Sequence, residues 1–214
     1  MNKDRRELIT AGAAALPGLA LGMTDEPCER PARGPDAHHF PNHVVVTHEG
    51  ARALFYDDLL AGKTVVIHCM SLATEPVYRT AEALARVQRL VGDRLGRDLF
   101  FYSLTVDPER DTPKALRDFA ARRGAGPGWL FLTGETAVMH ELRDRLYQGG
   151  AHVHDGQPGC SLALLRYGNA AVGLWGSVPA KADPAWIAQR LSWVQARDLP
   201  QGPPRRRGPA PLRA

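Results

Sequence analysis

The chain has 214 residues, of which 44% are hydrophobic, and its formal net charge is +4. This length and composition fit one globular domain with appendages and exclude a chain that is disordered throughout. Residues 23–199 hold 20 basic and 21 acidic residues, so the excess positive charge lies at the two ends. The body therefore lacks the basic surface that a nucleic-acid-binding protein needs.

Residues 1–22 are typical of a secretory signal peptide. Arg5 and Arg6 precede an uncharged stretch of mostly Ala, Leu and Gly that is too short for an ordinary membrane span. The arginine pair predicts the twin-arginine version of such a signal and a periplasmic or cell-envelope location. The alternative is an uncleaved anchor, which is the one route by which this sequence predicts membrane association.

The domain boundaries follow from composition. Residues 23–39 are rich in proline, glycine and charge and are interpreted as a linker. Residues 200–214 contain five prolines and four arginines and are interpreted as a disordered tail. We expect the folded domain over residues 40–199.

The first half of the domain alternates between strand and helix patterns. The β-branched run Val44–Thr47, a turn at residues 48–50 and an apolar segment at 53–55 predict an N-terminal β-hairpin. Thr64–His68 is apolar enough for a buried central strand. The spacing of Leu84, Val87 and Val91 predicts a helix over residues 76–95, and residues 99–106 form the next buried strand.

The second half continues the alternation with clearer helix ends. Thr112 as cap, Pro113 at the first position and Gly124 at the end delimit one helix. A strand at 130–133 and a helix at 135–147 follow, and then a glycine-rich loop at 148–160. The pattern predicts a strand at 162–166, a turn at Tyr167–Asn169 and a further strand around 172–174. Asp183 caps a last helix, whose inward residues we expect to be Trp186, Ile187, Leu191 and Val194.

This order, ββ–βαβα–βα–ββ–α, predicts an α/β fold. A βαβ unit followed by a hairpin and a closing helix is the thioredoxin-like arrangement, in which helices cover both faces of a mixed sheet.

One segment carries a resemblance to a known family. Residues 103–113 read Ser-Leu-Thr-Val-Asp-Pro-Glu-Arg-Asp-Thr-Pro, a strand that leads through Asp107 and Asp111 into a helix, and this resembles the Sco/SenC family. Residues 55–63, Trp129–Gly134 and Arg166–Asn169 resemble the family as well, so the likeness extends from about residue 40 to residue 194. The family places the Asp107–Asp111 turn near its metal site. Read from the residues alone, these carboxylates cap a helix N-terminus.

The resemblance implies a protein that delivers copper to a respiratory copper enzyme, mainly cytochrome oxidase, and that has such an enzyme subunit or another envelope protein as its partner. The family uses two cysteines three residues apart, at the start of the helix after the first central strand, together with a distant histidine. In this chain the paired positions fall on Ala73 or Thr74 and on Val77 or Tyr78, and the histidine position falls at or beside Cys160. Both halves of the family's copper site are therefore altered, which leaves open whether this chain binds copper.

Other ligands remain in the sequence. His152 and His154 lie in the glycine-rich loop near Cys160, and Cys69 follows the central strand as a further sulfur. A thiolate with one or two imidazoles is a plausible copper site. The alternative is a polar surface loop, with Cys69 as a small buried apolar residue.

Three functions follow from these observations. The first is a divergent Sco-type protein that assists assembly or copper loading of a respiratory copper enzyme in the envelope. The second is a redox-inert interaction module. The third is a one-cysteine thiol peroxidase that uses Cys69, although this residue lies upstream of the expected helix N-terminus. A dithiol oxidoreductase is disfavoured because the three cysteines, Cys28, Cys69 and Cys160, include no close pair, and the absence of paired redox cysteines argues against an enzyme.

Overall fold

The structure is a computed structural model that describes residue 34, residues 36–147 and residues 161–195. The predicted signal peptide, most of the predicted linker, the segment with His152, His154 and Cys160, and the predicted tail lie outside these residues. Seven strands form one sheet in the order β2-β1-β5-β4-β3-β6-β7. The strands are β1 (Val44–Thr47), β2 (Arg52–Leu54), β3 (Thr64–Met70), β4 (Leu99–Thr105), β5 (Trp129–Thr133), β6 (Leu164–Asn169) and β7 (Leu174–Pro179). The helices are α1 (Glu75–Tyr78), α2 (Thr80–Val91), α3 (Pro113–Arg123), α4 (Thr136–Tyr147) and α5 (Pro184–Trp193), with single turns at Phe55–Leu60, Gly92–Arg94 and Ser161–Ala163.

Strand β3 lies inside the sheet. It pairs in parallel with β4, from Thr64 opposite Leu99 to Met70 opposite Thr105, and antiparallel with β6. All seven residues of β3 are buried, as expected for a β-branched run that is covered on both faces. The predicted interior position of the Thr64–His68 strand and the N-terminal hairpin β1–β2 are therefore confirmed.

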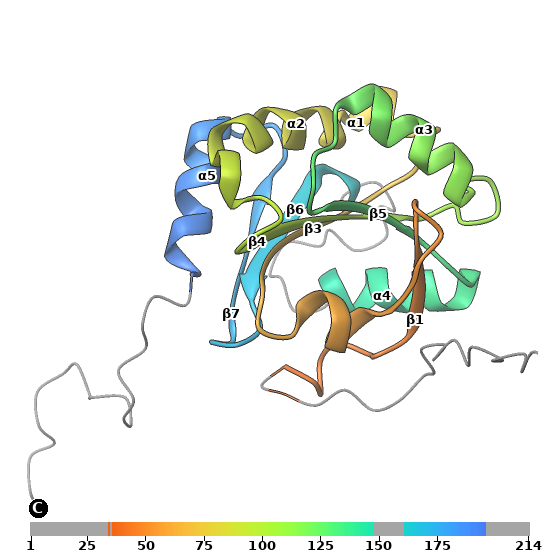
Figure 1. Cartoon of the computed structure of the whole chain (residues 1–214), viewed down its shortest axis with the longest axis horizontal. Helices are drawn as coiled ribbons and strands as arrows, with labels where there is room; N and C mark the ends of the chain where they lie inside the picture. The colour runs from red at the N-terminus through yellow and green to blue at the C-terminus, as the bar shows by residue number, and fades with distance from the viewer. Residues whose placement is uncertain (1–33, 35, 148–160, 196–214) are drawn as a thin grey trace, which may run out of the picture.

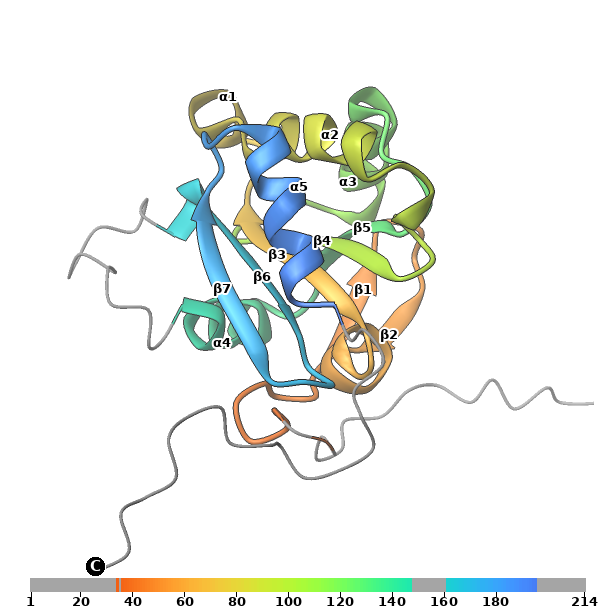
Figure 2. The ribbon, with the colours of Figure 1, turned by 90° about the vertical axis from the view of Figure 1, so that its left-hand side faces the viewer.

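Helices cover both faces of the sheet, which confirms the predicted α/β architecture (Figure 1). Helices α1, α2, α3 and α5 lie on one face, and α4 with the turn at Phe55–Leu60 lies on the other (Figures 1 and 2). Because side chains alternate along a strand, Val66 and Met70 enter the core under α2, whereas Ile67 and Cys69 enter the core on the α4 side. The two faces of β3 therefore belong to two separate cores.

The helix ends agree with the sequence signals. The Thr112 hydroxyl accepts a hydrogen bond from the Ala115 amide at 3.2 Å, and Gly124 ends α3 in the left-handed conformation with φ 64°. The Asp183 carboxylate accepts hydrogen bonds from the amides of Ala185 and Trp186 at the start of α5.

The helix predicted over residues 76–95 is divided. A single turn, α1, ends at Tyr78, and α2 begins at Thr80 after Arg79, which has the left-handed backbone conformation with φ 53°. The Glu75 carboxylate accepts hydrogen bonds from the amides of Ala81 and Glu82, which in a continuous helix would bond to the carbonyl groups four residues earlier. The hydrophobic spacing could not show this break, because the apolar stripe of α2 starts only after it.

Two further expectations are wrong. Tyr167–Asn169 does not form a turn, because β6 continues through Asn169 and pairs there with Thr64 of β3 and Leu174 of β7. Gly168 packs against the Trp175 ring, which a Cβ atom would approach to 2.3 Å, so this glycine allows packing and not a turn. Trp186 does not point inward and keeps 39% of its surface exposed, whereas Ile187, Leu191 and Val194 are buried.

Among the described residues, no helix is long and apolar enough to cross a membrane.

Candidate functional site

The candidate site lies where β3 ends. Residues 71–74 form a loop from β3 into α1, and the Asp107–Asp111 turn follows the neighbouring strand β4. The Val106 amide donates to the Met70 carbonyl at 2.8 Å, so the parallel pairing of the two strands continues into both turns. This pairing brings together two segments that are far apart in the sequence.

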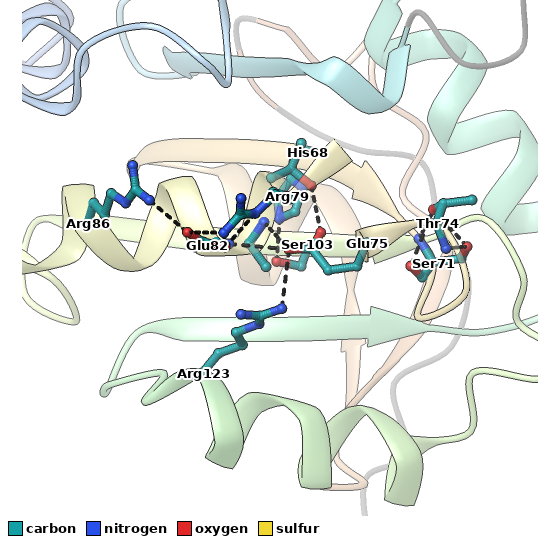
Figure 3. Close-up of polar contacts among 11 residues, drawn as sticks. His68, Ser71, Thr74, Glu75, Arg79, Glu82, Arg86, Ser103 and Arg123 are labelled. Carbon is teal, nitrogen blue, oxygen red and sulfur yellow. Dashed lines mark hydrogen bonds and ion pairs between the residues drawn. The ribbon is translucent and has the colours of Figure 1, made fainter. Parts of the chain in front are cut away.

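The loop of residues 71–74 is closed by its own polar groups. The hydroxyl oxygens of Ser71 and Thr74 lie 2.9 Å apart, and each hydroxyl also accepts a hydrogen bond from the other residue's amide at 3.2 Å (Figure 3). Such reciprocal bonds satisfy the backbone groups at a strand end and hold the loop in one conformation. Ala73, at the tip, is exposed.

Asp111 joins the two segments. One oxygen of its carboxylate accepts hydrogen bonds from the Leu72 amide at 3.1 Å and from the Thr105 hydroxyl at 2.5 Å. The side chain is buried, and burial raises its pKa above the usual value, with a smaller effect in the same direction from the charge of Asp107. The carboxylate of Asp111 was expected to cap α3, but the Thr112 hydroxyl caps this helix. Asp111 bonds instead to the Leu72 amide on the other side of the site. Asp107 stays partly exposed and has Arg110 at 3.7 Å.

Glu75 is a buried carboxylate at the start of α2. It accepts hydrogen bonds from the Thr80 hydroxyl at 3.1 Å and from the amides of Ala81 and Glu82 at 3.0 and 3.2 Å. The Arg123 guanidinium approaches it from α3 at 3.9 Å (Figure 3). An anion at a helix N-terminus is stabilised by the free amide groups and by the helix dipole. Glu75 therefore supplies the negative charge at the point where a helix would otherwise stabilise a thiolate.

His68 faces the opposite side of β3 from Cys69. Its Nε2 atom lies 2.6 Å from the Ser103 hydroxyl, which also accepts a hydrogen bond from the Trp129 indole at 2.9 Å. Because Trp129 can only donate, the pattern fits a Ser103 hydroxyl that donates to a neutral His68. Complete burial lowers the pKa of His68 to about 3, so the ring stays uncharged at neutral pH.

Cys69 lies within β3 and is completely buried on the α4 side. Burial raises the pKa of its thiol to about 12, against smaller opposing effects from Arg143 and from a hydrogen bond with Tyr147. A nucleophilic or metal-binding cysteine acts as the thiolate, which this environment disfavours. The geometry thus argues against the peroxidase function.

We expect Cys69 to be unreactive in the native protein. In a Cys28→Ser/Cys160→Ser variant, where Cys69 is the remaining thiol, a thiol reagent at pH 7.5 should label no protein over the time in which it labels an exposed cysteine completely. Denaturant should restore full labelling, which serves as the control for the assay. Rapid labelling without denaturant would contradict the burial of this thiol.

The positions that the resemblance assigns to the paired cysteines carry no sulfur. Ala73 and Thr74 belong to the closed loop, Val77 is 70% exposed on α1, and Tyr78 packs partly against the core on the α4 side. Within the described residues, no group of three His, Cys, Asp or Glu side chains is placed to hold a metal ion. The proposed ligands His152, His154 and Cys160 lie outside those residues, so the copper site on that loop stays a prediction.

Sequence reasoning missed Glu75 and the Ser71–Thr74 pair. The sequence offers one signal for Glu75: a glutamate near an expected helix start has a favourable interaction with the helix dipole. Its partner amides at Ala81 and Glu82 become accessible only because the chain breaks at Arg79.

Comparisons with known proteins agree with this fold. A family model described as SCO1/SenC matches residues 62–158, which include the loop after β3, the Asp107–Asp111 turn and α4. None of the curated proteins compared with the chain matches it.

Several solved structures are similar to this chain. A SCO1/SenC family lipoprotein from Bacillus anthracis has a TM-score of 0.57 and 17% identity, with 72% of this chain and 94% of that chain covered. BsSco, described as a member of the Sco family of cytochrome c oxidase assembly proteins, has a TM-score of 0.57 and 17% identity, with 70% and 89% covered. Copper-bound Sco1 from yeast has a TM-score of 0.52 and 15% identity, with 70% and 87% covered.

At these identities the solved structures establish the fold, which is the thioredoxin-like fold of Sco proteins. The family model adds the sequence match across the candidate site. Over residues 62–158 the chain is similar to the SCO1/SenC family.

Proposed function

We propose that this protein assists the assembly or copper loading of a respiratory copper enzyme of the cytochrome oxidase type, with a copper site that is altered or lost. The match of residues 62–158 to the SCO1/SenC family model supports the general role. One structural relative is described as a cytochrome c oxidase assembly protein, and another was crystallised with copper bound.

The observation that carries this proposal is the closed polar loop after β3. Where the family resemblance implies two thiolates, this chain has Thr74 bonded to Ser71, and the Glu75 carboxylate occupies the N-terminus of α2. Hydroxyl and carboxylate oxygens are hard ligands, which suit Cu(I) poorly. The described residues after β3 offer no soft ligand, which supports a copper site on residues 148–160, with Cys160 as the thiolate, His152 or His154 as a further ligand and Cys69 as a possible second sulfur.

An envelope location supports the same role. The first 22 residues resemble an export signal, and the similar solved structures include a lipoprotein. The partner we propose is a subunit of the copper enzyme or another envelope protein.

The proposal is tested by a Cu(I) competition titration. If the 148–160 loop holds copper, the wild type should bind about one Cu(I), and Cys160→Ser should weaken binding by at least about tenfold, because it removes the soft ligand of the site. The His152→Ala/His154→Ala double variant should weaken binding as well, and Cys69→Ser reports whether the second sulfur takes part. Cys28→Ser is the matched control, since it removes a thiol from the linker.

The outcomes separate the two accounts of the site. Binding of copper by Cys160→Ser with wild-type affinity would exclude the loop site. A wild type that binds no copper above background would favour the redox-inert interaction module, for which the hydrogen-bonded loop and the exposed Val77 on α1 are the supporting observations.

A further inference from the structure

Helix α5 carries two exposed tryptophans with a half-buried arginine between them. Trp186, Arg190 and Trp193 are spaced by four and three residues, so they share one side of the helix. Trp186 is 39% exposed and Trp193 is 56% exposed, whereas Ile187 and Leu191 on the other side are buried in the core. Large exposed aromatic residues next to one another commonly mark a contact surface.

The arginine between the two tryptophans is available for an anion. The Arg190 guanidinium lies 4.5 Å from the ring centre of Trp186 and 4.3 Å from that of Trp193. Its Nε atom is buried without an acceptor, and within residues 36–147 and 161–195 no carboxylate pairs with Arg190. A guanidinium held between two indole rings is partly stripped of water, which strengthens its attraction to an anion.

The residues next to α5 in the structure and in the sequence are also apolar or basic. Strand β7 leads into α5 and lies beside it (Figure 2). Leu174, at the start of β7, is 50% exposed and shares the α5 side of the strand with the buried Val178. Directly after Gln195, residues 196–214 contain five arginines and one aspartate. The helix that directly precedes a strongly basic segment therefore carries apolar rings and a guanidinium that has no carboxylate partner in the described part of the chain.

We propose that the outer side of α5 binds the surface of a membrane that contains anionic phospholipids. Tryptophan rings partition to the interface between headgroups and acyl chains, and arginine binds headgroup phosphates. A basic segment next to such a helix adds long-range attraction to an anionic surface. The sequence alone pointed to membrane association only at the N-terminus, whereas this surface lies on the folded domain and is independent of copper binding.

Vesicle binding of the full-length protein tests the proposal. We expect stronger binding to phosphatidylcholine vesicles that contain phosphatidylglycerol than to phosphatidylcholine alone, and weaker binding when the salt rises from about 0.1 to about 0.5 M. The Trp186→Ala/Trp193→Ala variant should lower the partition coefficient about tenfold, because two apolar rings leave the interface. Arg190→Gln should lower it about fivefold.

Two controls test whether binding depends on the tryptophans of α5. Val77→Ala removes a more exposed apolar side chain from α1 and should leave binding unchanged. Brominated phospholipid should quench most of the emission from Trp186 and Trp193. In the double tryptophan variant, emission from the buried Trp129 and the partly buried Trp175 should persist. Wild-type binding by the double variant, or no preference for anionic vesicles, would overturn the proposal. A wild-type dimer that the double variant dissociates, without vesicle binding, would also overturn it and identify this surface as a contact between two copies of the chain.

Discussion

Replacing Glu75 by alanine should lower the free energy of unfolding by about 3 kcal/mol. The substitution removes the acceptor for the Thr80 hydroxyl and for the amides of Ala81 and Glu82, and these donors are at or near a buried helix start. It also leaves Arg123 without its carboxylate. Urea unfolding followed by circular dichroism measures the loss directly.

Two further variants test the cause of this loss. Glu75→Gln keeps one carbonyl oxygen that can accept from the two amides, so it should cost about 1 kcal/mol. Glu82→Ala removes a carboxylate on α2 that pairs with the exposed side chains of Arg79 and Arg86, and it should change stability far less because water screens these pairs. If Glu75→Ala were as mild as Glu82→Ala, Glu75 would not hold the start of α2.

Asp111 should make the stability of this protein fall as the pH rises above about 4. Burial raises the pKa of the folded carboxyl above that of the unfolded chain, so the folded state binds the proton more tightly. Stability from this group is therefore greatest below the unfolded pKa and decreases as the pH rises through the folded pKa. Many other groups titrate in this range. The contribution of Asp111 is therefore measured as the difference in the free energy of unfolding between the wild type and a variant without the charge.

Asp111→Asn is that variant. Its amide oxygen can accept from the Leu72 amide and the Thr105 hydroxyl, which both contact one carboxylate oxygen in the wild type. The stability of the wild type relative to Asp111→Asn should decrease as the pH rises from the unfolded pKa of about 4 through the raised pKa of the folded carboxyl. Asp111→Ala, which loses both contacts, should cost about 2 kcal/mol and speed hydrogen exchange at the Leu72 amide. A constant difference between wild type and Asp111→Asn across this range would contradict a raised pKa.

Much of the fold could be predicted because its signals are local. A β-branched run such as Thr64–His68 indicates a buried strand within its own few residues, and Thr112, Pro113 and Gly124 mark the ends of α3 within one turn of it. The Asp107–Asp111 segment likewise carries the family resemblance in consecutive residues. The absence of a close cysteine pair follows from the positions of the three cysteines in the sequence.

The details of the site could not be predicted, because they depend on which distant segments the fold brings together. Asp111 bonds to Leu72 because β3 and β4 run in parallel and end at the same edge, and nothing near Asp111 in the sequence indicates that partner. Trp186 has the helical spacing of an inward residue, yet it lies outside, because Ile187 and Leu191 already fill the contact with the sheet.

The sequence by itself thus predicted the succession of strands and helices, the resemblance to the SCO1/SenC family and the absence of a close cysteine pair, since each of these depends on neighbouring residues. The tertiary structure alone decided that the helix after β3 is divided at Arg79 and that Glu75 accepts from the start of its second part. It also decided that Asp111 holds the loop at Leu72 and that an arginine lies between two indole rings on α5. The physical reason is that the function of a buried carboxylate or an aromatic ring depends on the hydrogen-bond donors and the side chains that surround it. Those are supplied by segments that become neighbours only when the sheet forms.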